Sequence, residues 1–172
     1  MPTSGDIVIS YAKGAEDMAH LRALFTEYQQ WLNVDLCFQG FDEELKNLPG
    51  KYAEPSGCLL LARDGDAIAG CVGMWPLAEG VCEMKRLYVR PQWRGRGLGR
   101  RLAIEILAEA KTRGYRIMCL DTLPQLTTAL ALYKNLGFAE TEPYYDNPIE
   151  GVSYLQLDLK SRQLSSESPT SS

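Results

Sequence analysis

The stretch RPQWRGRGLGRRLA, Arg90 to Ala103, concentrates five arginines and three glycines in fourteen positions and contains no acidic residue. The wider window from Lys85 to Arg101 holds seven basic residues and no acid, although the whole chain has a net charge of −4. The rest of the chain therefore carries a net charge of −11. A run of basic residues is usually a solvated helix face, but the interleaved glycines favour a loop that contacts an anion.

Three glycines, Gly95, Gly97 and Gly99, lie at the start of a predicted amphipathic helix. A helix N-terminus presents unpaired N–H groups and the positive end of the helix dipole. Glycine allows the backbone to approach a bound anion closely and to adopt positive φ values. Cationic side chains surround these glycines: Arg94, Arg96, Arg100 and Arg101. The combination predicts a phosphate-binding loop.

Two other phosphate-binding motifs do not fit the spacing. A Walker loop, GxxxxGK[ST], requires a lysine that does not follow these glycines. The dinucleotide fingerprint GxGxxG requires a glycine at Arg100 or at Leu102, depending on which glycine begins the motif. A turn that contains glycines by chance stays open as the plainest alternative.

The pattern of apolar residues on either side of the loop predicts an α/β protein. We expect strands at residues 7–11, 58–63, 67–75, 81–89, 115–121, 138–140 and 152–159. We expect helices at residues 15–32, 41–48, 98–113 and 126–136. The glycine loop would follow the carboxyl end of a strand, which is where open α/β sheets bind small ligands.

Length and composition predict one domain over residues 1–160, followed by a disordered serine-rich tail at 161–172. No stretch approaches the roughly 18 apolar residues of a membrane span, so we expect no membrane partner. The first residues, MPTSGDIVIS, lack a signal-peptide pattern, which favours a cytoplasmic location.

Charge and metal-ligating residues restrict the partners further. Net acidity argues against general binding of nucleic acid, whereas the local basic patch favours a small anionic ligand. The five cysteines include no CxxC pair, and the chain has a single histidine. We therefore expect no metal site.

The sequence resembles the GNAT superfamily of N-acyltransferases in two places. Arg94 to Gly99, RGRGLG, matches the R/Q-x-x-G-x-G/A signature that cradles the pyrophosphate of coenzyme A in that family. Ala129 to Phe138, ALALYKNLGF, resembles the family's A-x-x-L-Y-x-x-x-G-F signature. The resemblance implies a mixed, mostly antiparallel central sheet of about six to seven strands flanked by helices. It also implies acetyl-CoA as the cosubstrate.

The same resemblance implies which residues hold coenzyme A. Backbone groups of the strand at Leu87, Tyr88 and Val89 would pair with the pantetheine arm like an added strand. The loop would bind the pyrophosphate through Arg94, Gly95, Arg96, Gly97, Leu98, Gly99 and Arg100. One position departs from the family pattern, because Leu126 stands where an asparagine often helps to hold coenzyme A.

Two residues are candidates for the chemistry. Tyr133 matches the family tyrosine that lies near the sulfur and protonates the leaving thiolate, although its position on an apolar helical stripe also fits a core aromatic. Glu83 lies eleven residues before Arg94, the spacing of the base glutamate in histone-acetylating members. Its alternative role is a structural ion pair with Lys85 or Arg86.

We expect the acceptor to be a primary amine of a small molecule or a peptide, and a homodimer stays open. Two segments are candidates for contact with it: the polar, aromatic loop Glu142 to Gly151, and a negative rim around the first helices. The rim residues are Asp35, Asp42, Glu43 and Glu44. The alternative to an enzyme is a module that binds acyl-CoA without turning it over.

Overall fold

The computed structural model describes residues 6–34 and 40–160. The predicted tail at 161–172 and the rim residue Asp35 lie outside the described residues.

The centre of the molecule is a seven-stranded sheet in the order β1-β2-β3-β4-β5-β7-β6. Its strands are β1 (Val8–Tyr11), β2 (Cys58–Asp64), β3 (Ala67–Ala78), β4 (Val81–Val89), β5 (Ile117–Thr122), β6 (Ala139–Glu140) and β7 (Ser153–Asp158). All neighbours are antiparallel except β4 and β5, which are parallel. The predicted mixed, mostly antiparallel sheet is therefore confirmed.

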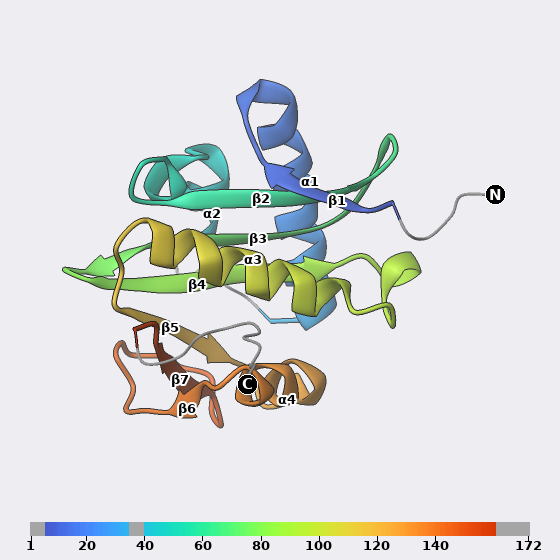
Figure 1. Cartoon of the computed structure of the whole chain (residues 1–172). Coiled ribbons are helices and arrows are strands. Elements are labelled where there is room, and N and C mark those ends of the chain that lie inside the picture. The colour runs from blue at the N-terminus through green and yellow to red at the C-terminus, as the bar shows by residue number, and fades with distance from the viewer. Residues whose placement is uncertain (1–5, 35–39, 161–172) are drawn as a thin grey trace, which may run out of the picture.

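Helices cover both faces of the sheet (Figure 1). They are α1 (Gly14–Leu32), α2 (Phe41–Lys46), α3 (Leu98–Thr112) and α4 (Thr127–Asn135), with single 3-10 turns η2 (Gly50–Tyr52) and η3 (Pro91–Trp93). Helix α3 lies across one face, while α1 and α2 lie on the other. Each predicted helix and strand is present, with its ends shifted by three residues at most.

The core is divided by the sheet into two apolar clusters. Along β2, Leu60 faces the cluster of α3 and α4, whereas Leu59 and Leu61 face the cluster of α1. This alternation is the two-residue period of a strand buried on both sides. It explains why the strand reads as an unbroken apolar run in the sequence.

Strand β4 carries a β-bulge in its second half. Lys85 pairs with Gly73 and Tyr88 with Cys71, so β4 advances three residues while β3 advances two. Arg86, inside the bulge, has a φ of 60°, a left-handed conformation that is uncommon for a residue with a side chain. The bulge breaks the alternation, and the side chains of Lys85 and Arg86 lie on the same face.

The same strand separates from its parallel neighbour. Strands β4 and β5 pair only where Val81, Cys82 and Glu83 face Ile117, Met118 and Cys119. Beyond Glu83 the two strands diverge, which leaves an opening in the middle of the sheet. Residues 84–89 of β4 have no paired strand on this side within the described residues, and residues 84–87 line the opening.

Candidate active site

The opening between the two strands contains a cavity of about 40 Å³, called here the β4–β5 cavity. Twelve residues line it: Tyr28, Leu32, Met84, Lys85, Arg86, Leu87, Leu120, Asp121, Thr122, Leu123, Tyr133 and Ile149. Roughly 10–15 Å³ of such space is enough to hold one water molecule, so the cavity has room for a small reacting group.

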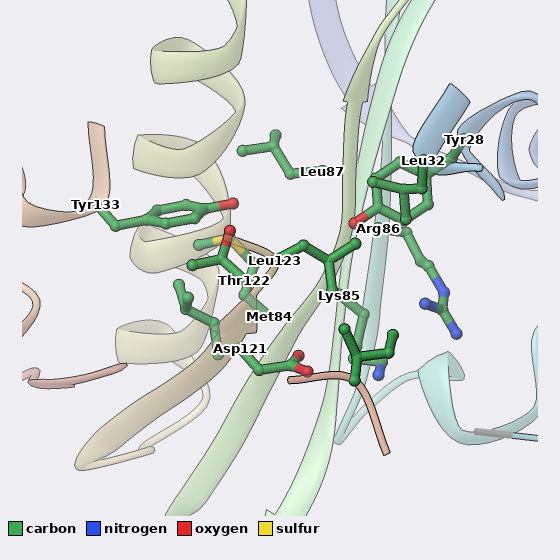
Figure 2. A pocket seen from close by; sticks show the side chains of 12 residues that line it. Tyr28, Leu32, Met84, Lys85, Arg86, Leu87, Asp121, Thr122, Leu123 and Tyr133 are labelled. Atoms are coloured by element: carbon green, nitrogen blue, oxygen red, sulfur yellow. The ribbon is translucent and has the colours of Figure 1, made fainter. Parts of the chain in front are cut away.

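The lining side chains come from both faces of the sheet (Figure 2). Tyr133 and Thr122 lie on one side, among the residues packed with α3 and α4. Tyr28 and Arg86 lie on the other side, next to α1 and α2. The cavity thus connects the two faces, so two substrates could meet in it from opposite directions.

The glycine loop has an open conformation that would suit a bound anion. Gly95 and Gly97 have φ values of 82° and 79°, and a Cβ atom at either would meet no described atom within 4 Å. Gly97 is the N-cap of α3, and no described side chain caps this helix end. The N–H groups of the first turn are therefore open to a ligand.

The arginines of the loop already have partners within the chain. Arg94 donates from Nε to the carbonyl of Val89 at 2.8 Å, and its guanidinium lies 4.7 Å from the centre of the Trp31 ring. Arg100 donates to Asn135 Oδ1 at 2.6 Å, and Arg96 donates to the carbonyl of Gln92 at 3.4 Å. These contacts hold the cationic side chains close to the glycines.

At two other predicted cofactor positions, Leu98 and Tyr88, the side chain is packed inside the protein and only backbone groups are available. Leu98 is 2% exposed and packs in the core. The Tyr88 side chain points to the face opposite α3, where it meets the rings of Tyr28 and Trp31. Leu126 precedes α4 and packs against the α1 cluster.

Tyr133 lies in the lining of the cavity and is 7% exposed. Its ring packs edge-on against Phe138, with 5.8 Å between the centroids. Within the described residues its hydroxyl makes no hydrogen bond. Burial, and then the proximity of Tyr28 and Asp121, raises the pKa of Tyr133 well above its ordinary value. The tyrosine is both a core aromatic and a protonated hydroxyl facing the cavity.

Glu83 is held by three side chains. Its Oε1 accepts a 2.8 Å hydrogen bond from Trp75 Nε1, and its Oε2 accepts one of 2.8 Å from the hydroxyl of Tyr144. Lys85 Nζ lies 3.9 Å from Oε2. The ion pair considered as its alternative role is therefore present, and Glu83 lies next to the cavity residue Lys85 rather than in the cavity lining.

The bulge places a second ion pair beside the first. Arg86 donates to Glu44 from Nη2 at 2.7 Å and from Nε at 3.0 Å, and both side chains are at most 6% exposed. Glu44 therefore neutralises an arginine inside the protein rather than contributing to a negative rim. Burial, reinforced by the charge of Arg86, lowers the pKa of Lys85.

Sequence reasoning missed the polar residues that β5 contributes. Asp121 accepts hydrogen bonds from the Tyr145 hydroxyl and from Asn147 Nδ2. Thr122 is 5% exposed, and its Oγ1 has no hydrogen-bond partner within the described residues. Their position at the carboxyl end of a predicted strand was the available signal.

Comparison with known proteins places this geometry in a family. The family model "Acetyltransferase (GNAT) family" matches residues 19–138. An uncharacterized N-acetyltransferase of Schizosaccharomyces pombe is 46% identical over 161 residues, covering 92% of this chain and 99% of the relative. The chain belongs to the GNAT acetyltransferase family and is an acyltransferase.

Solved structures agree with this fold. An acetyltransferase from Streptococcus agalactiae superposes with a TM-score of 0.74 at 18% identity, covering 90% of this chain and 99% of that one. A Salmonella typhimurium structure with its cofactor acetyl-CoA has a TM-score of 0.63 at 20% identity, covering 91% of this chain and 95% of that one.

Two kinds of feature are absent from residues 6–34 and 40–160. None of the helices in these ranges is long and apolar enough to cross a membrane. The same ranges contain no group of three or more histidine, cysteine or acidic residues that could hold a metal ion.

Proposed function

We propose that this protein transfers the acetyl group of acetyl-CoA directly to a primary amine of a small molecule or peptide. The observation that carries the proposal is the β4–β5 cavity, which lies between the backbone of β4 and the hydroxyl of Tyr133. The phosphate-type loop follows the end of the same strand. One extended ligand could therefore reach from the loop to the cavity.

The residues present suit coenzyme A at each point. The open N–H groups at Gly95 to Gly99 suit a pyrophosphate, and the neighbouring arginines supply positive charge. The β4 backbone at Leu87, Tyr88 and Val89 borders the opening, where it can pair with the amides of the pantetheine arm. A backbone N–H in this stretch can also stabilise the oxyanion that forms from the thioester carbonyl.

In the proposed reaction, the neutral amine attacks the thioester carbon, a C–N bond forms and the C–S bond breaks. The Tyr133 hydroxyl gives its proton to the leaving sulfur and regains one from the acylated nitrogen. The ammonium form must first lose a proton, and we propose that this proton leaves by way of Glu83, through water or Lys85. The products are an N-acetyl amine, coenzyme A and one proton.

The test is thiol release from acetyl-CoA with a broad panel of primary amines, beside calorimetric titration with coenzyme A, ATP and NAD. The proposal expects binding of coenzyme A alone and amine-dependent thiol release. Coenzyme A binding without turnover of any amine would instead support a non-catalytic acyl-CoA-binding module. Preferential binding of ATP or NAD would contradict both the acetyltransferase and the acyl-CoA-binding module.

A further inference from the structure

We infer that Asp121 holds the ammonium group of the acceptor, and that this acceptor has no carboxylate on the carbon that bears the nitrogen. The inference rests on the proposed function and specifies its substrate class. Such an acceptor carries a CH₂–NH₃⁺ group, as alkylamines and the side chain of lysine do.

The first observation is the free oxygen of Asp121. Both hydrogen bonds to this carboxylate, from Tyr145 and Asn147, go to Oδ2, and the second is 3.3 Å long. Within the described residues Oδ1 accepts none, although each carboxylate oxygen can accept two. Asp121 is partly exposed and lines the cavity, so a ligand in the cavity can reach its carboxylate.

The second observation is the balance of charge around the cavity. Lys85 and Arg86 each have a carboxylate of their own, Glu83 at 3.9 Å and Glu44 at 2.7 Å. Among residues 6–34 and 40–160, no lysine, arginine or histidine nitrogen lies within 4.0 Å of the Asp121 carboxylate. Lys85 also interacts with Asp121 at longer range, but the two cations face three carboxylates, Glu83, Glu44 and Asp121. This group of side chains therefore keeps one net negative charge, which favours a cationic partner.

The third observation is the hydroxyl of Thr122, which also lines the cavity. It is buried and has no partner within the described part of the chain. A buried polar group without a partner is unfavourable, and a polar ligand atom would offset that cost. Together with the Asp121 carboxylate and the Tyr133 hydroxyl, Thr122 thus adds a polar atom of the cavity that a ligand can use.

The same charges disfavour an α-amino acid or any amine with an adjacent carboxylate. Such a carboxylate would lie close to Asp121 once the ammonium group is bound there. Both cations of the cavity lining already have partners. Like charges placed side by side repel each other, which weakens binding.

The first experiment compares α-amino acids with the amines obtained by replacing their carboxylate with hydrogen, such as phenylalanine with 2-phenylethylamine. We expect the amine to exceed its amino acid by at least about tenfold in kcat/KM, since each 1.4 kcal/mol corresponds to a factor of ten. Preference for the amino acids would overturn the inference and leave the proposed function intact. Turnover of neither class would overturn the proposed function and the inference with it.

The second experiment uses Asp121→Asn and the best amine of that panel. Loss of a charged hydrogen bond should raise the KM for the amine about 10- to 100-fold, with the KM for acetyl-CoA unchanged. An analogue of this amine with two fluorines on the carbon next to the CH₂–NH₂ group is largely uncharged at pH 8. Asp121→Asn should therefore hardly change the KM for the analogue. Tyr145→Phe is the matched control, because it removes a hydrogen bond to Oδ2 and keeps the charge. If Asp121→Asn raised the KM equally for the charged amine and for its fluorinated analogue, the role of Asp121 would be structural and the inference would be overturned.

Discussion

Glu44 of α2 and Arg86 of the β4 bulge are joined by two hydrogen bonds, of 2.7 and 3.0 Å, in a region where neither side chain is more than 6% exposed. Burial by itself would raise the pKa of Glu44, but the hydrogen bonds and charge of Arg86 outweigh it and lower the pKa. The pair therefore fixes the one left-handed residue of β4 to the helix that covers it.

We expect Glu44→Gln to lower the free energy of unfolding by about 3–5 kcal/mol, because it removes a carboxylate that accepts two hydrogen bonds from a buried arginine. Urea unfolding at pH 7 measures this loss. Glu43→Gln is the control: Glu43 is exposed and lies 3.8 Å from Lys46 on the same helix, so its loss should stay below about 1 kcal/mol.

The same pair predicts a dependence on pH. Since the pKa of Glu44 is lower in the folded protein, its contribution to stability is complete above the unfolded pKa of about 4.3. It is lost as the pH falls through the folded pKa. The difference between wild type and Glu44→Gln should therefore be constant near neutrality and shrink below about pH 4.3. A difference that persists unchanged at pH 2 would contradict the assignment.

Tyr133→Phe should lower kcat by about 10²-fold, the low end of the range for a general acid. The effect is modest because burial raises the pKa of Tyr133, which makes it a weak acid, while a thiol is a fair leaving group. Steady-state kinetics should show little change in the KM for acetyl-CoA. Tyr115→Phe is the matched control, since that hydroxyl donates to the Ser56 carbonyl and lies outside the cavity lining. Full kcat in Tyr133→Phe would remove the tyrosine from the mechanism.

Gly97→Val should abolish measurable binding of coenzyme A in calorimetry, because valine rarely adopts the φ of 79° found there. Gly65→Val provides the same backbone strain in the hairpin turn, where φ is 63° and space is equally open. Thermal melts should show similar destabilisation for the two variants, whereas only the loop variant should lose the ligand. Loss of binding in both would indicate a general effect on the fold.

Glu83→Gln should reduce kcat by about 10²- to 10⁴-fold at neutral pH if Glu83 carries the amine proton. Part of this loss should be recovered at high pH, where the free amine is already neutral. Trp75→Phe removes a hydrogen bond to Glu83 and retains the carboxylate, so it serves as the comparison. A pH-independent loss accompanied by lower stability would assign Glu83 to holding Tyr144 and Lys85.

The sheet and the loop were predictable because each depends on local patterns. Strand β2 could be recognised from its apolar run, and the turn after it from Asp64-Gly65-Asp66. The glycines before α3 indicated an anion site, and positive φ values at Gly95 and Gly97 are in line with it. Family resemblance then identified Tyr133 as a candidate before its position was known.

The acceptor side of the site could not be predicted, because it depends on how distant elements meet. A left-handed arginine follows no sequence rule, and without the bulge at Arg86 the side chain of Lys85 would not share its face. Glu44 was interpreted as a surface charge since its partner lies 42 residues away. Asp121 becomes part of the cavity only because β4 and β5 diverge after three paired residues.

The pairing of only three residues between β4 and β5 also makes this the weakest connection between neighbouring strands in the middle of the sheet. Strands β1 to β4 and strands β5 to β7 form two well-paired halves, joined by the pairing of Val81–Glu83 with Ile117–Cys119. A ligand that bridges the opening adds contacts to both halves at their weakest join. Hydrogen exchange of the amides of Ile117 to Cys119 should therefore report whether a ligand occupies the opening. The exchange should slow when a bound ligand holds the two halves together.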